Sequence, residues 1–174
     1  MQMVTTGATD GKVRIFDLRR RDCISSWSVT GDTSDVCGVA TLQPSHDDTS
    51  VYTMTSGGLL AQWSLVQTGQ KMLEASLSSS EEGAGYFSDP ARFPRNSLSS
   101  AVFTFTSDER HILACSTDGG DLYKVKGDEV EKVLGLKGHA SHLTCVDWSH
   151  STDHGPCVTG SFDGQIKVST FLCQ

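Results

Sequence analysis

Apolar and polar residues alternate along four stretches of the chain, and each stretch is divided by a short polar turn that contains glycine. Each stretch starts with a β-branched or apolar run and ends in a second apolar run. An Asp-Gly or Gly-Gly pair between two alternating runs predicts a β-hairpin, because a type I′ turn needs positive φ at both central residues. We therefore expect four hairpins of related sequence, which are internal repeats, over residues 4–17, 51–64, 112–125 and 157–170.

The spacing of these hairpins favours a β-propeller over a sandwich. The turn residues Asp10, Gly57, Asp118 and Asp163 are separated by 47, 61 and 45 positions, close to the roughly 40–45 residues of one propeller blade. The longest interval contains the Ser-rich segment 76–100, which we expect to be an insertion loop, because its Ser, Glu and Gly residues offer little apolar surface to bury.

Six further apolar segments supply the remaining strands. They are residues 23–29, 36–42, 70–77, 101–106, 130–134 and 143–148. With the eight strands of the hairpins they make 14 strands, whereas blades contain four strands each. The sequence therefore predicts an all-β chain of about three and a half four-stranded blades, which cannot close into a ring by itself.

Composition supports strands and excludes several classes of function. The chain has 174 residues, the length of one domain, and Ser and Thr together occupy 40 positions. Its formal net charge of -7 repels phosphate backbones and argues against nucleic-acid binding. Because no stretch has the length of a spanning apolar helix and the first residues lack the pattern of a signal peptide, we expect a cytoplasmic protein without a transmembrane segment.

The cysteines and histidines raise the question of a metal site. We interpret the six cysteines as reduced core thiols, since no C-x-x-C pair occurs. They are Cys23, Cys37, Cys115, Cys145, Cys157 and Cys173. A cluster of possible zinc ligands also lies within 19 residues, comprising His139, His142, Cys145, His150, His154 and Cys157. We expect neither a metal nor a cofactor, because Cys145 falls on a core strand and His150 and His154 lie in a polar turn without rigid geometry.

The last repeat carries a family resemblance. Gly138-His139, the strand 146–149 and the segment 159–164 resemble, in order and spacing, the signature of WD-repeat β-propellers. The resemblance implies that His139, Thr159 (or Ser161) and Asp163 belong to a buried hydrogen-bonded tetrad that is structural and not chemical. A buried imidazole and a buried carboxylate are costly unless they satisfy each other, which gives His139 a partner other than zinc.

The repeats also depart from the family pattern. No repeat keeps the Trp-Asp pair that ends a typical third strand, and the places are taken by Phe16-Asp17, Trp63-Ser64 and Ser169-Thr170. Gly31-Asp32 stands where Gly-His is expected in the second blade, so we assign no full tetrad there. The resemblance further implies that the chain, residues 1–174, is the C-terminal half of a seven-bladed propeller, with residues 170–174 at or near the end.

A narrower resemblance points to a cellular role. Residues 134–141, the strand 146–149 and the ending 164–170 are similar to one member of the family that acts in endosome maturation. This implies a non-catalytic interaction scaffold, peripheral on early and late endosome membranes. The implied partners are a late-endosomal Rab GTPase and a Beclin-containing phosphatidylinositol 3-kinase complex, which the protein would restrain.

Two other readings remain open. Phe16, Asp17 and Arg19 resemble the W-D-x-R box of substrate receptors of cullin ubiquitin ligases, with Phe in place of Trp, although residues 19–21 also suit a solvated basic loop. Tyr86, Phe87 and Phe93 form either a partner-binding knuckle or an aromatic segment that packs back onto the propeller. We expect no catalysis, since no nucleophile elbow, H-E-x-x-H motif or phosphate loop occurs.

Overall fold

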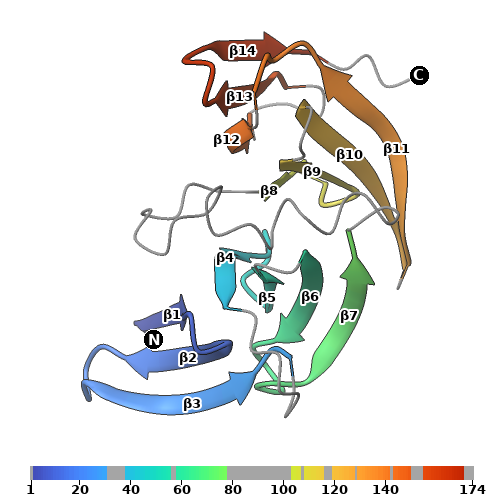
Figure 1. Cartoon of the computed structure of the whole chain (residues 1–174). Coiled ribbons are helices and arrows are strands. Elements are labelled where there is room, and N and C mark those ends of the chain that lie inside the picture. Colours follow the sequence, from blue (N-terminus) through green and yellow to red (C-terminus); the bar gives the residue numbers. More distant parts are fainter. Residues whose placement is uncertain are drawn as a thin grey trace. The chain divides into compact units, whose positions relative to one another are not determined.

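The computed structural model describes residues 2–30, 38–55, 58–77, 103–106, 108–115, 119–127, 129–141, 143–149 and 155–170. Throughout these ranges the regular structure is β, with 14 strands in four antiparallel sheets (Figure 1). The chain consists of two compact units, Met1–Ser79 and Ser80–Gln174, and each unit contains one three-stranded and one four-stranded sheet.

The first unit contains seven strands. Its three-stranded sheet has the order β1-β2-β3, and its four-stranded sheet has the order β4-β5-β6-β7. The strands are β1 (Met3–Gly7), β2 (Lys12–Asp17), β3 (Asp22–Ser28), β4 (Val39–Pro44), β5 (Ser50–Thr55), β6 (Leu59–Ser64) and β7 (Lys71–Ser76).

The second unit repeats this design in the opposite order along the chain. The four-stranded sheet comes first, with the order β11-β10-β9-β8, and the three-stranded sheet β12-β13-β14 follows. The strands are β8 (Phe103–Phe105), β9 (His111–Cys115), β10 (Gly119–Lys126), β11 (Glu129–Lys137), β12 (Leu143–Trp148), β13 (Cys157–Ser161) and β14 (Ile166–Ser169).

All four predicted hairpins are present, as β1–β2, β5–β6, β9–β10 and β13–β14. The expectation of an all-β chain with unclosed antiparallel sheets is therefore confirmed. Strand limits moved by a few residues: the expected segment 36–42 is β4 at Val39–Pro44, and the expected segment 130–134 is the longer β11. Of the predicted insertion loop 76–100, Ser76 belongs to β7, and residues 78–100 lie outside the described residues.

The core of the first unit lies between its two sheets. Six buried residues from β2, the end of β3, and β4 to β6 pack together, and Trp27, Leu42 and Leu65 pack against them. The six are Val13, Val29, Val39, Val51, Ala61 and Trp63. Because side chains alternate across a strand, Val13 and Ile15 of β2 are buried while Lys12 is exposed. The two sheets therefore share one apolar layer.

The second unit buries β12 against the four-stranded sheet, where it lies next to β8 and β9. Phe103, Ile112, Leu113, Leu143 and Val146 are each at most 2% exposed. The aromatic rings of Phe103 and Phe105 meet edge to face with 5.5 Å between centroids, a favourable arrangement of aromatic pairs. This packing fixes the position of the sheet that carries His139's partners.

Close approach of two backbones at Gly119 allows a first prediction. A Cβ atom at Gly119 would collide with the carbonyl oxygen of Leu136 on the adjacent strand β11. We therefore expect Gly119→Ala to lower the free energy of unfolding by about 1–3 kcal/mol, since backbone cannot move aside as a side chain can.

Urea unfolding of the protein measures this effect, and Gly135→Ala is the matched control on the same strand pair. A Cβ at Gly135 meets the Asp121 carboxylate at 3.3 Å, which is flexible, so we expect a change within about 1 kcal/mol. Equal losses for the two variants would show that the approach at Gly119 is not restrictive.

Candidate functional site

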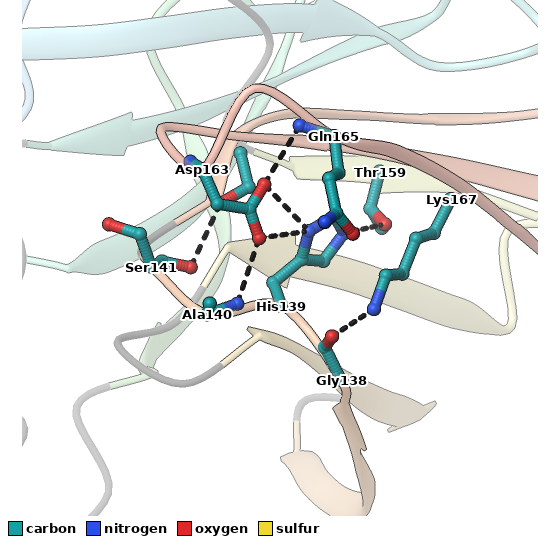
Figure 2. A network of polar contacts seen from close by, with 9 residues as sticks. Gly138, His139, Ala140, Ser141, Thr159, Asp163, Gln165 and Lys167 are labelled. Carbon is teal, nitrogen blue, oxygen red and sulfur yellow. Dashed lines mark hydrogen bonds and ion pairs between the residues drawn. The ribbon is translucent and has the colours of Figure 1, made fainter.

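His139 occupies the loop between β11 and β12 and reaches the β13–β14 hairpin (Figure 2). Its Nδ1 lies 3.2 Å from Asp163 Oδ2, and its Nε2 lies 2.9 Å from Thr159 Oγ1. The side chains of His139 and Asp163 are only 4% and 9% exposed. With the proton on Nδ1, His139 donates to Asp163 and accepts the hydroxyl proton of Thr159. We call these three residues the polar staple.

Asp163 receives further hydrogen bonds from the backbone. The amide N–H of Ala140 donates to Oδ2 at 2.8 Å, and the amide N–H of Gln165 donates to Oδ1 at 2.9 Å. One carboxylate therefore binds its own turn and the loop that carries His139. Figure 2 shows these contacts converging on Asp163 from both sides.

Two side chains beside the staple, those of Ser161 and Lys167, add contacts between the same two segments. The hydroxyl of Ser161 donates to the carbonyl of Ser141 at 3.0 Å and accepts the amide N–H of Asp163 at 3.2 Å. The ammonium group of Lys167 donates to the carbonyl of Gly138. Of the two hydroxyls considered for the partner of His139, Thr159 thus lies against the imidazole, and Ser161 joins the loop one step further on.

These contacts set the acidity of Asp163. Burial by itself would raise the pKa of the carboxyl group, but the hydrogen bonds from Gln165, Ala140, His139 and Ser161 lower it to about 2 from an ordinary 3.8. A carboxylate held in this way stays charged at neutral pH and has little tendency to take up a proton. The arrangement suits a fixed electrostatic contact and not a general base.

The depressed pKa predicts a dependence of stability on pH. Because the pKa in the folded state lies below the ordinary value, the stabilisation by Asp163 is complete above about pH 4 and is lost as pH falls towards 2. Urea unfolding between pH 5 and pH 3 should therefore show a shallower decline for Asp163→Asn than for the unmodified protein. Parallel declines in this range would contradict the assignment.

The second hairpin has a different hydrogen bond at the positions that correspond to those of the last hairpin. The indole Nε1–H of Trp63 donates to Thr53 Oγ1 at 2.9 Å, and both side chains are buried. Thr53 precedes its turn residue Gly57 by four positions, as Thr159 precedes Asp163. In the last hairpin the place of Trp63 is taken by Ser169, which pairs with Cys157.

Sequence reasoning did not single out the Thr53–Trp63 pair. The sequence signal for this pair is a Thr four residues before the turn residue, combined with a Trp six residues after it. Each of the two hairpins therefore retains a complementary part of one hydrogen-bonding scheme.

Sequence reasoning also did not single out two turns in which an Asp carboxylate accepts hydrogen bonds. In the β4–β5 turn, Asp47 accepts the hydroxyl of Ser45 at 2.7 Å and the amide N–H of Thr49 at 3.1 Å, and these bonds lower its pKa to about 2. In the β8–β9 turn, Asp108 accepts the hydroxyl of Thr106 at 2.6 Å and the amide N–H of Arg110 at 3.0 Å. The signal was a Ser or Thr two residues before an Asp between two strands.

The turn between β2 and β3 contains the residues of the proposed W-D-x-R-like box. Phe16 is half-buried, and the Asp17 side chain is 15% exposed. Asp17 Oδ1 accepts the amide N–H of Arg19 at 2.9 Å, and the Asp17 carbonyl accepts the amide N–H of Arg21 at 2.8 Å. We call residues 17–22 the arginine turn. Its backbone is held by Asp17, and its three arginine side chains are exposed.

Other sequence expectations had mixed outcomes. Trp63 and Trp148 are buried, and Trp27 packs against the core with 6.0 Å between its ring centroid and that of Trp63. Cys115 and Cys157 are buried, but the core assignment of Cys23 was wrong. Cys23 is exposed because it follows the arginine turn on β3, an outer strand of a three-stranded sheet.

Some candidate residues cannot be placed. Tyr86, Phe87 and Phe93 fall outside the described residues, as do Cys37 and Cys173 and the histidines 142, 150 and 154. In the part of the chain that the structure describes, no group of three His, Cys, Asp or Glu side chains is arranged to hold a metal ion. The same part contains no helix with the length and apolar character needed to cross a bilayer.

Comparison with known proteins gives matches to one group. The WD40 family (WD domain, G-beta repeat) matches residues 130–168, which include the whole polar staple. Over 99% of its length the chain is 36% identical to WD repeat-containing protein 91 of Xenopus tropicalis, and over 98% it is 36% identical to that of Pongo abelii. A homologue in Dictyostelium discoideum is 25% identical over 96% of the chain.

The chain spans only part of these relatives. It covers 23% of the Xenopus protein, 24% of the Pongo protein and 19% of the Dictyostelium protein. The chain thus carries a WD repeat and is similar along nearly its whole length to WD repeat-containing protein 91, which confirms the resemblance that the residues of the last repeat indicated. Rigid sheets that present turns are a common scaffold for protein contacts.

Proposed function

We propose that this WD-repeat chain is a non-catalytic scaffold for protein partners in the maturation of early into late endosomes. Its partners are a late-endosomal Rab GTPase and the Beclin-containing phosphatidylinositol 3-kinase complex, whose activity it restrains. The observation that carries the proposal is the alignment of 99% of the chain with WD repeat-containing protein 91, together with the narrower likeness of residues 134–141, 146–149 and 164–170 to an endosomal member of the family.

The polar staple supports a structural role for its residues within this scaffold. His139 and Asp163 satisfy each other, and the surrounding bonds join the loop 138–141 to the β13–β14 hairpin. A turn that is held in one conformation loses less entropy when a partner binds. We therefore assign His139, Thr159 and Asp163 to shaping the binding platform, and we place the protein peripherally on the cytoplasmic side of endosome membranes.

Affinity capture tests the proposal. The complete protein that carries this segment, and a form that lacks it, are each used to capture partners from cell lysate, and the captured proteins are identified by mass spectrometry. We expect the Rab GTPase and kinase-complex subunits with the complete protein alone. Capture of the same subunits by the shortened form would place the endosomal contact elsewhere and contradict the proposal.

A second candidate function is that of a substrate receptor for a cullin ubiquitin ligase. The observation in its favour is that Arg19 is exposed on a turn that directly follows Phe16 and Asp17. Loss of ligase-adaptor capture in Arg19→Glu, with the endosomal partners retained, would support this candidate. Unchanged adaptor capture, or none in the unmodified protein, would exclude it.

A further inference from the structure

The arginine turn concentrates positive charge in an otherwise acidic chain. Lys and Arg number 14 against 21 Asp and Glu, yet three arginines follow one another at the β2–β3 turn, at the end of the blue hairpin in Figure 1. Arg19, Arg20 and Arg21 are all exposed, and the side chain of Arg20 is 75% exposed. Consecutive like charges repel one another. The placement of three arginines in one turn therefore calls for an explanation.

Elsewhere in the described residues, basic side chains are commonly paired with a nearby carboxylate. Ion pairs join Arg14 to Asp10, Lys71 to Glu74, Arg110 to Asp108, Lys126 to Glu131 and Lys132 to Asp121. In the arginine turn the one ion pair among the described residues is long, with 4.0 Å between Arg20 Nε and Asp17 Oδ2. Within the same described part of the chain, Arg19 and Arg21 have no ion pair.

The turn contains two carboxylates, those of Asp17 and Asp22, and the Asp17 carboxylate is already engaged. Asp17 is 15% exposed, and its Oδ1 accepts the amide N–H of Arg19. Its carbonyl accepts the amide N–H of Arg21, which adopts a left-handed conformation with φ of 60°. Asp17 therefore organises the backbone, and the exposed guanidinium groups of Arg19 and Arg21 have no ion pair among the described residues.

An exposed apolar residue lies beside this charge. Leu18 is 53% exposed, and its amide N–H donates to the carbonyl of Gln2 at 3.1 Å. The turn is thus tied to the start of β1 as well as to Asp17. The turn has three guanidinium groups against two carboxylates, with one apolar side chain, and arginine is enriched among the residues that dominate binding.

We propose that the arginine turn is a docking site for an acidic, carboxylate-rich segment of a protein partner. This inference rests on the proposed scaffold function and assigns it a contact surface. Guanidinium groups bind carboxylates through two parallel hydrogen bonds. A bilayer is the less suitable occupant, because anionic membranes are bound by clusters of about 4–8 basic residues and the net charge of -7 opposes adsorption.

A binding experiment with purified protein tests the site. The probe is a short fluorescent peptide of glutamates separated by glycine, and its binding to the complete protein is followed by fluorescence anisotropy. We expect the triple variant Arg19→Glu, Arg20→Glu and Arg21→Glu to bind about tenfold more weakly or worse, and added salt to weaken binding to the unmodified protein.

Two further variants separate the specific site from total charge. The variant Lys12→Glu, Lys124→Glu and Lys137→Glu makes the same change in net charge at exposed positions away from the turn, and it should retain most of the binding. Replacing the three arginines by lysine keeps the charge but removes the paired geometry, so an intermediate affinity is expected. Circular dichroism checks that every variant is folded.

Several outcomes would overturn the proposal. These are equal binding by the two charge-reversed variants, no binding by the unmodified protein, and binding only to phosphatidylcholine vesicles that contain about 20% phosphatidylserine. Capture of the Rab GTPase and kinase subunits shows whether only the docking site at the arginine turn is wrong or the proposed scaffold function as well. If the capture requires the segment but is unaffected by the arginine variant, the scaffold stands and its contact surface lies elsewhere.

Discussion

The His139→Ala variant is expected to lose about 3 kcal/mol of unfolding free energy, because it removes both hydrogen bonds of the imidazole, which join the loop 138–141 to the last hairpin. The imidazole is 4% exposed and contacts Asp163 at 3.2 Å and Thr159 at 2.9 Å. Its removal leaves a nearly buried carboxylate without its imidazole partner, which costs more than the loss of an exposed contact. Urea unfolding at neutral pH measures the difference.

Gln165→Ala is the matched control for this variant. Gln165 contributes to the staple through its backbone N–H, which donates to Asp163 at 2.9 Å, and alanine keeps that group. Its side chain is exposed, so we expect a change within about 0.5 kcal/mol. A comparable loss for both variants would mean that the imidazole contributes nothing particular, and the polar staple would then be a coincidence of geometry.

The Trp63→Ala variant should show the largest loss of stability, about 3–5 kcal/mol. Trp63 is 4% exposed, lies in the core cluster of the first unit and packs against Trp27. Alanine would leave a cavity between the two sheets, and the Thr53 hydroxyl would lose its indole donor. Chemical unfolding followed by far-ultraviolet circular dichroism measures the loss without relying on the fluorescence of the removed indole.

A double-mutant cycle separates packing from hydrogen bonding at this position. Trp63→Phe removes the donor and Thr53→Val removes the acceptor, so the coupling between the two changes should be about 1 kcal/mol. Val66→Ala serves as the surface control, since Val66 is 78% exposed. A loss below about 1 kcal/mol for Trp63→Ala would contradict the placement of this ring in the core.

The hairpins were predictable because their signal is local. Alternating residues on both sides of an Asp-Gly turn, as at Asp10 and Asp163, specify strand, turn and strand within about 14 residues. His139 was also within reach, since Gly-His before a strand and Asp in the following turn keep a regular spacing. A buried imidazole then needs a partner, and the carboxylate of Asp163 is the group that the repeat brings to it.

Other features depended on contacts that local patterns do not specify. The bond between Trp63 and Thr53 joins positions ten residues apart across two strands, in a blade whose sequence lacks the Gly-His pair of a complete tetrad. Cys23 was assigned to the core from its apolar neighbours, yet its place on the outer strand β3 exposes it. The ordered backbone of the arginine turn rests on Asp17, whose part in the turn the charge pattern did not reveal.

The chain is similar to WD repeat-containing protein 91 along nearly its whole length. The match includes the whole polar staple, and it extends over both compact units. A scaffold of this kind needs stable sheets and exposed turns, and the structure provides both at the staple and at the arginine turn.

The most direct measurement is a titration of the purified Rab GTPase into the complete protein and into a form that lacks residues 1–174, followed by calorimetry. We expect saturable binding to the complete protein and none to the shortened form. Equal binding by the two forms would contradict the central claim, because the contact would then lie outside this WD-repeat segment.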